Sequence, residues 1–140
     1  MSGSRPYRDV VSPGYYEDYP GSEKEDRMEE KKSMLQLAVA AMQDKKGESI
    51  VQLHIGERSV IADDFLIVSG SSRSQLDALL DGVEEALGRA GYPLRDREGS
   101  SDGGWILLDY GDLVVHIFLR EMREFYDLEH TWRDVTRTVY

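Results

Sequence analysis

Two short acidic segments carry the side chains best suited to hold a metal ion. Asp63 and Asp64 precede an apolar run, and Asp109 and Asp112 bracket the pair Tyr-Gly. Two carboxylates that lie close together can bind Mg²⁺, which prefers oxygen ligands. Asp is also favoured in turns, because its side chain hydrogen-bonds the local backbone. The spacing favours turns over a metal site, and we predict that the protein uses no metal and no cofactor.

The three histidines offer acid–base chemistry, but their positions argue against it. No two of His54, His116 and His130 have the i, i+4 spacing of a helical metal site. A catalytic histidine also needs a positioned partner. His54 and His116 fall within predicted strands, where a lone histidine is more often a hydrogen-bonded packing residue. We therefore interpret the histidines as structural.

A serine-rich loop, Ser-Gly-Ser-Ser-Arg at 69–73, joins a predicted strand to the start of a predicted helix. Backbone N–H groups at a helix N-terminus can bind a phosphate or a carboxylate. The loop lacks the Gly-rich, Lys-bearing pattern of a P-loop. A polar cap on the helix is therefore the favoured interpretation.

Trp105 is the strongest candidate for a binding residue. It follows the polar loop 99–104 and opens a predicted strand. Large aromatic side chains beside such loops are often partly exposed, and Trp is enriched in the hot spots of protein interfaces. Core packing under the last predicted helix is the alternative, and the sequence alone does not decide between the two.

The segments that must position these residues alternate between helical and strand patterns. Apolar residues at helical spacing predict helices over 29–46, from the cap at Ser72 to the stop at Gly91, and over 122–132. Strands are predicted over 50–55, 65–68, 94–98, 105–109 and 113–118. The short connection 110–112 joins the last two strands as a hairpin.

This order of elements predicts an α/β fold with a mixed sheet of about five strands and helices packed on it. The single domain is expected to span 28–133. Residues 1–27 contain three prolines and four tyrosines but few aliphatic side chains, which predicts a disordered acidic tail. Residues 134–140 carry no clear pattern and are expected to form a short C-terminal tail.

The charge of the chain constrains its partners. Its 140 residues carry a formal net charge of −10. Lys and Arg supply most nucleic-acid affinity by displacing counterions, so we expect little direct contact with nucleic acid. A basic macromolecular partner is favoured, although acidity that serves only solubility is an equally good explanation.

The sequence also predicts a location. No run approaches the roughly 20 consecutive apolar residues that span a bilayer, and the N-terminus lacks the apolar stretch of a secretory signal. The absence of cysteine is compatible with a reducing compartment. We therefore expect a cytoplasmic protein without a membrane association.

Three separated segments resemble the signatures of the Iojap-related ribosomal silencing factor S family. They are ADDFLIVSGSSR at 62–73, WILLDYGDLVVHIF at 105–118 and REFYDLEHTW at 123–132. Their order matches that of the family, and the resemblance covers roughly 34–132. It implies a fold similar to that of nucleotidyltransferases.

The resemblance implies a translational repressor that performs no reaction. Members of this family bind the large ribosomal subunit through a basic ribosomal protein, the fourteenth by its usual number, and sterically block joining of the small subunit. Trp105 matches a tryptophan of the family's docking surface. Ile106, Glu98, Asp109 and Asp112 lie near it in the motifs and are further partner-binding candidates.

Two other functions stay open on the sequence alone. Nucleotidyltransferases follow a Gly-Ser motif with an Asp-x-Asp pair that holds two metal ions. Gly70 and Ser71 are followed by no such pair, and a fold alone confers no activity, so we predict that the protein is not an enzyme. An exposed Trp105 would alternatively pair two copies about a twofold axis, as in a homodimeric scaffold.

Overall fold

The computed structural model describes the backbone of residues 20–140 and the side chains from Glu23 onward. Residues 34–140 form one α/β domain built on a six-stranded sheet. Residues up to 33 belong to a separate unit, of which the structure describes the first part of helix α3 (Pro20–Asp44). This helix begins nine residues before the predicted start, and residues 1–19 of the predicted tail lie outside the described part of the chain.

The sheet has the strand order β3-β4-β5-β2-β1-β6. Strands β2 and β5 run parallel, and every other neighbouring pair is antiparallel. The strands are β1 (Glu48–Leu53), β2 (Asp64–Gly70), β3 (Asp96–Ser100), β4 (Trp105–Asp109), β5 (Leu113–Leu119) and β6 (Arg137–Val139). Short 3₁₀ turns occupy Ile55–Glu57 and Ser101–Gly103. The predicted mixed α/β fold is confirmed.

The sheet has a sixth strand, the C-terminal β6, which the sequence did not predict. It pairs with β1 along the edge of the sheet, within the segment that was expected to be a tail. The Tyr140 hydroxyl donates to Oε1 of Gln52 at 2.6 Å, and the Thr138 hydroxyl lies 3.1 Å from Nε2 of His54. A three-residue strand with one apolar side chain gives no readable alternation, so this part of the domain was missed.

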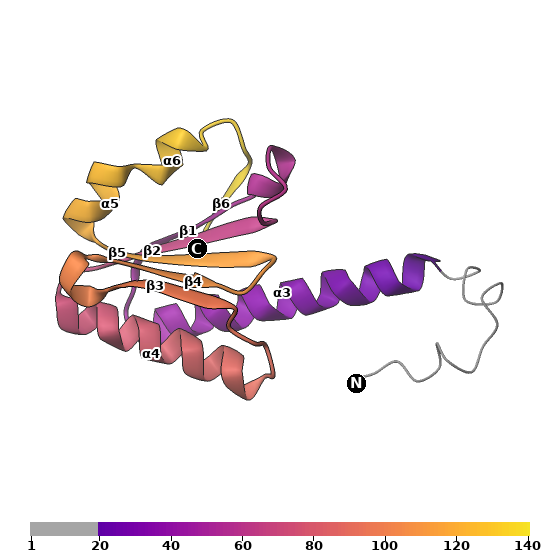
Figure 1. Ribbon diagram of the computed structural model, residues 1–140, viewed down its shortest axis with the longest axis horizontal. Helices are drawn as coiled ribbons and strands as arrows, with labels where there is room; N and C mark the ends of the chain where they lie inside the picture. Colours follow the sequence, from indigo (N-terminus) through magenta and orange to yellow (C-terminus); the bar gives the residue numbers. More distant parts are fainter. Residues whose placement is uncertain (1–19) are drawn as a thin grey trace. The chain divides into compact units, whose positions relative to one another are not determined.

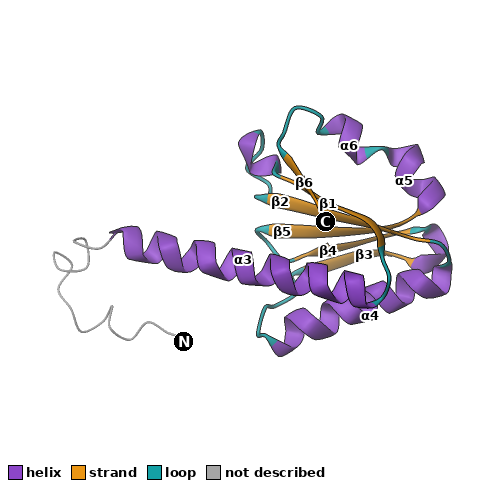
Figure 2. Ribbon diagram, turned by 180° about the vertical axis from the view of Figure 1, so that it is seen from behind, coloured by secondary structure: helices purple, strands orange, loops and turns teal. Residues whose placement is uncertain are grey.

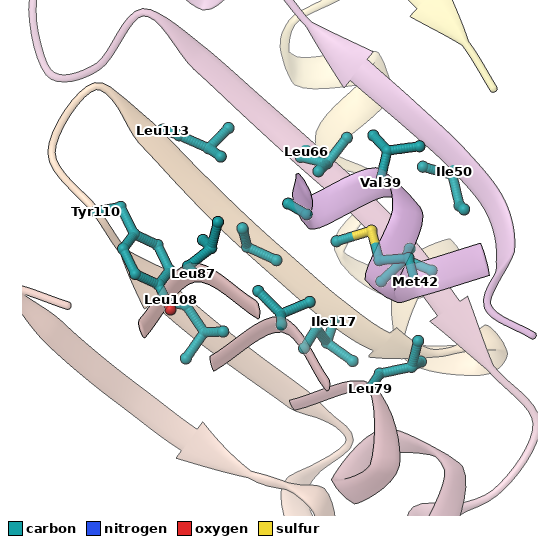
Figure 3. Close-up of a cluster of buried hydrophobic side chains, with 14 of the residues drawn as sticks. Val39, Met42, Ile50, Leu66, Leu79, Leu87, Leu108, Tyr110, Leu113 and Ile117 are labelled. Carbon is teal, nitrogen blue, oxygen red and sulfur yellow. The ribbon is translucent and has the colours of Figure 1, made fainter. Parts of the chain in front are cut away.

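Helix α4 (Arg73–Arg89) and the part of α3 from residue 34 onward cover one face of the sheet (Figures 1 and 2). From Met34 onward, α3 contributes to the larger hydrophobic core. The apolar stripe of α4 faces the same core and is fully buried. Figure 3 shows these helical side chains against Leu66, Leu108 and Ile117 of the sheet.

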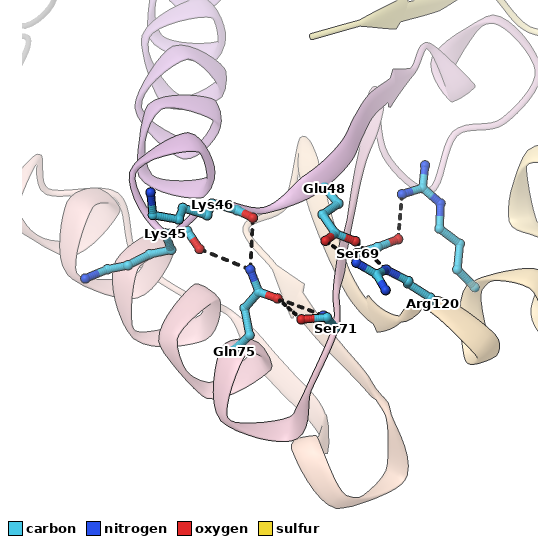
Figure 4. Close-up of polar contacts among 8 residues, drawn as sticks. Lys45, Lys46, Glu48, Ser69, Ser71, Gln75 and Arg120 are labelled. Carbon is cyan, nitrogen blue, oxygen red and sulfur yellow. Dashed lines mark hydrogen bonds and ion pairs between the residues drawn. The ribbon is translucent and has the colours of Figure 1, made fainter.

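Gln75 joins the end of α3 to the start of α4 (Figure 4). The Ser72 hydroxyl caps α4 by accepting from the Gln75 backbone N–H at 3.1 Å, as predicted. The Gln75 side chain accepts from the Ser71 N–H at 2.7 Å and donates to the carbonyl oxygens of Lys46 at 2.9 Å and Lys45 at 3.3 Å. One amide thus satisfies backbone groups at two helix ends that would otherwise lack partners.

The opposite face carries two short helices, α5 (Arg120–Tyr126) and α6 (Leu128–Thr131). The sequence predicted one helix over 122–132, and this was wrong because the chain turns at Asp127, whose φ is +47°. Asp tolerates this left-handed conformation better than most residues. Its side chain then caps α6 by accepting from the His130 N–H at 3.3 Å.

Arg123 attaches α5 to the sheet. Its Nε and Nη2 donate to the two carboxylate oxygens of Glu129 at 3.1 Å each, and its Nη1 donates to Ser69 Oγ at 2.9 Å and to the Ser49 carbonyl at 2.6 Å. Ser49 has a φ of +51° where the β1–β2 register shifts. The guanidinium, only 10% exposed, therefore stabilises both the helical layer and an unfavourable backbone conformation.

Replacing this guanidinium should destabilise the domain. We expect Arg123→Lys to lower the free energy of unfolding by about 2–3 kcal/mol, because an ammonium cannot form the bidentate pair and the two further bonds. Urea denaturation measures the change. Arg89→Lys is the matched control, since the Arg89–Glu85 pair is 79% and 64% exposed and should contribute less than about 0.5 kcal/mol. Equal losses for both variants would contradict this role of Arg123.

Candidate functional site

The face that carries α5 and α6 is left open over β3 and β4. Helix α5 contacts β5 and β2, whereas every side chain of β3 is exposed. Burial alternates along β4, with Trp105, Leu107 and Asp109 partly exposed on this face. Successive side chains of a strand point to opposite faces, so this side of β4 carries three partly exposed residues, with Trp105 at the border of α5.

Trp105 lies on this open face with its indole half-buried. The ring stacks on Phe118 with a centroid distance of 4.9 Å and contacts the ring of Tyr126 at 4.4 Å. Its Nε1–H donates to Nδ1 of His116 at 3.1 Å. The sequence left open whether Trp105 is an exposed binding residue or a core residue. In the structure its side chain packs on the core and also borders the surface.

A pocket of about 240 Å³ opens beside the indole. It is lined by Glu98, Gly99, Trp105 and Leu107. Gly99 has a φ of +82°, and a Cβ there would lie 2.1 Å from the Trp105 carbonyl oxygen. Only glycine fits this close approach of β3 to β4. The pocket is smaller than those that enclose drug-sized ligands, and its apolar wall with one carboxylate suits a single side chain of a partner.

Three carboxylates gather at the outer edge of the open face. Asp96 pairs in register with Asp109, and Glu98 follows two residues along β3. A hydrogen bond between the carboxyl groups of Glu98 and Asp96, in which protonated Glu98 donates, and the negative charges of Asp96 and Asp109 raise the pKa of Glu98. Like charges thus crowd this edge, and a cationic group from a partner would relieve their repulsion.

The structure brings together three of the five residues that the sequence proposed for the site. Trp105, Glu98 and Asp109 share the open face. Ile106 does not, because strand alternation turns its side chain, which is 0% exposed, into the core beneath α4. Asp112 is exposed, but it lies in the β4–β5 hairpin, at the end of β4 away from Trp105.

The Asp109 carboxylate acts within the turn, whereas Asp112 contributes through its backbone carbonyl. Oδ1 of Asp109 accepts from the Gly111 N–H at 2.7 Å. The carbonyl of Asp112 accepts from the N–H groups of Asp63 and Asp64 at 2.9 and 3.0 Å. Across the described residues, no group of three or more His, Asp and Glu side chains is arranged to hold a metal ion.

Sequence reasoning missed four contributors to the site. Asp96 and Leu107 could have been found, since alternation along each strand places them beside Glu98 and Trp105. Tyr126 and Phe125 gave no such signal, because both fit a packing role on a helix. Phe125 is 74% exposed and its ring lies 5.1 Å from that of Tyr126, so α5 extends the aromatic surface beyond the indole.

His54 and His116 both form hydrogen bonds inside the domain. His54 bridges Asp64, 3.1 Å from Nδ1, and Thr138, 3.1 Å from Nε2, and so ties β6 to β1 and β2. His116 lies under the open face, where burial lowers its pKa to about 3. Its ring is therefore neutral at physiological pH.

The family model described as "RsfS: Ribosomal silencing factor during starvation" matches residues 28–139. This chain belongs to the ribosomal silencing factor family. The match begins at the predicted start of the domain and runs through β6, in agreement with the pairing of that strand in the sheet.

Relatives of the silencing factor family cover most of the domain. The ribosomal silencing factor RsfS of Halalkalibacterium halodurans is 41% identical over 101 residues, which are 72% of this chain and 86% of that protein. A crystal structure from Chromobacterium violaceum superposes with a TM-score of 0.70 at 34% identity, covering 72% of this chain and 84% of the other. The mouse protein named mitochondrial assembly of ribosomal large subunit protein 1 is 28% identical over 101 residues, covering 70% of this chain and 44% of that one.

The described helices do not have the properties of membrane-spanning helices. Among residues 20–140, no helix combines the length and the apolar character that crossing a bilayer requires. The helices instead present apolar stripes to the two cores of the domain.

The buried imidazole predicts a specific loss of stability in acid. The pKa of His116 is about 3 in the folded state and near 6.5 when exposed, so the unfolded chain binds the proton first as the pH falls. Stability should therefore decrease below pH 6.5 by up to ~1.4 kcal/mol per pH unit. Relative to His116→Phe, the wild type should lose roughly 2 kcal/mol between pH 6.5 and 5 in urea titrations. Parallel pH profiles for the two proteins would contradict this assignment.

Proposed function

We propose that this protein docks on the large ribosomal subunit through the open face of β3 and β4, and there blocks joining of the small subunit. One observation carries the proposal: a half-buried, hydrogen-bonded indole lies beside three carboxylates on a partly open sheet face, at the border of α5. The name of the family points to silencing of ribosomes. The name of the mouse relative points to the large subunit.

A basic ribosomal protein, the fourteenth of the large subunit by its usual number, is the proposed contact. The chain carries a net charge of −10, and Asp96, Glu98 and Asp109 concentrate negative charge beside the pocket. Opposite charge accelerates encounter and fixes orientation. Trp105 and Leu107 supply the apolar area that a central hot spot needs.

The proposed mechanism is steric and requires no reaction. A folded domain that occupies the contact surface of one subunit excludes the other. The enzyme alternative rests on the Gly-Ser motif at Gly70 and Ser71. This loop has a structural role, because both the N–H and the hydroxyl of Ser71 donate hydrogen bonds to the Gln75 side chain. The geometry of that loop thus favours a helix cap, and the repressor remains the function that the site supports best.

Removing the indole should abolish most of the binding. We expect Trp105→Ala to weaken binding to purified large subunits by at least ~2 kcal/mol, roughly 30-fold in the dissociation constant, as for other hot-spot residues. Co-sedimentation at fixed salt concentration measures the change. The variant should also lose stability, since the ring stacks on Phe118.

Trp132→Ala is the control for that loss of stability. Its ring is likewise half-buried and packs against the same core, near Phe65. This variant should keep its affinity for the large subunit. If both variants lose affinity equally, binding depends on stability and the assignment of Trp105 is wrong.

Sedimentation equilibrium of the free protein should further show whether two copies pair through this face instead.

Reversing one charge at the pocket should weaken binding in a salt-dependent way. We expect Glu98→Lys to raise the dissociation constant for large subunits by about tenfold at low salt, with a smaller factor at high salt, because exposed charges are screened. Glu85→Lys changes the net charge equally but lies on α4, which covers the other face. Its affinity should stay within about twofold of the wild type. An equal effect of both substitutions would mean that only net charge matters.

A further inference from the structure

His116 is a polar side chain in an apolar environment. It is 3% exposed and lies between Leu107 and Ile67 in the sheet register. Its ring centroid lies 4.5 Å from that of Phe65, which it meets edge-on, and 6.1 Å from that of Phe118, to which it is stacked. Burial keeps the ring neutral. An aliphatic or aromatic residue would fill the same space without a polar atom, so packing does not explain the imidazole.

The hydrogen bonds of the ring identify its tautomer. The indole N–H of Trp105 donates to Nδ1 of His116 at 3.1 Å, so the proton of the neutral imidazole is on Nε2. Within the described part of the chain, Nε2 has no hydrogen-bond partner. A buried donor without an acceptor costs about 1–3 kcal/mol. The imidazole therefore lowers stability on one side while it satisfies the indole on the other.

The effect on Trp105 is to fix the orientation of its ring. Stacking on Phe118 and contact with Tyr126 hold the indole on two sides. The hydrogen bond to His116 directs Nε1 inward and leaves the rest of the ring to line the pocket beside Glu98. A side chain that is already ordered loses less conformational freedom when a partner binds.

We propose that His116 is a positioning residue that pre-organises the Trp105 indole for docking. The inference rests on the proposed function, because it assumes that Trp105 contacts the large subunit. It assigns His116 no contact with the partner. The side chain acts through the orientation of the indole, and its unpaired Nε2–H is the cost in stability of that role.

Two substitutions separate the acceptor from the shape of the ring. His116→Phe retains an aromatic ring and removes the acceptor. His116→Asn places an amide oxygen at the same number of bonds from Cβ as Nδ1, so it can accept from the indole. We expect His116→Phe to match or exceed the thermal midpoint of the wild type while its dissociation constant for large subunits rises roughly 3- to 10-fold. His116→Asn should bind within about twofold of the wild type.

Nuclear magnetic resonance of the free protein gives a readout that does not involve ribosomes. The indole N–H signal of Trp105, assigned with Trp105→Phe, should exchange slowly with solvent in the wild type and in His116→Asn. In His116→Phe it should shift and exchange faster. Unchanged exchange in His116→Phe would overturn the proposal, and so would equal losses of affinity in the two variants of His116.

The outcomes also separate this inference from the proposed function. If Trp105→Ala binds large subunits as tightly as the wild type, docking through the indole is wrong. If Trp105→Ala binds weakly while a folded His116→Phe binds normally, docking through Trp105 stands and the role of His116 is refuted.

Discussion

The two-residue period of strand β4 is the constraint on which both the core and the site depend. Ile106 and Leu108 point toward the face that α4 covers and are fully buried in the larger core. Trp105, Leu107 and Asp109 point the other way and are partly exposed, with Trp105 against Tyr126 of α5. A shift of one residue in the register would exchange these two sets. The proposed docking surface therefore depends on the same strand pairing that buries the core.

The sequence predicts the regular parts of this arrangement well. Alternation and helical spacing identified β4, β5 and α4, and the cap at Ser72 was placed correctly. Strand β6 was missed because three residues carry no periodic signal. The break at Asp127 was missed because it depends on a backbone conformation and on a cap that forms only after the chain turns.

The site itself could be predicted only in part. Position in a motif selected Trp105, which is partly exposed on β4, but also Ile106, whose side chain faces the opposite side of the strand. Strand alternation would have replaced Ile106 with Leu107 and added Asp96. No local pattern predicts the contact of Trp105 with Tyr126 or its hydrogen bond to His116, because these residues meet only when α5 and β5 are in place.

Features of the open face that lower stability are those that suit it to a partner. Crowded carboxylates raise the pKa of Glu98, and His116 buries an N–H without an acceptor. Arg123 offsets such costs elsewhere by fixing α5 to the sheet. Under the proposed function, a cationic group of the partner would relieve the repulsion among these carboxylates.

The proposed function can be measured on the joining of the two ribosomal subunits themselves. Light scattering of purified small and large subunits, mixed after the large subunit has been saturated with this protein, reports how many complete ribosomes form. We expect joining to be blocked, and to be restored as the protein is diluted below its dissociation constant. Full association at saturating protein, with the protein shown to be bound to the large subunit, would contradict it.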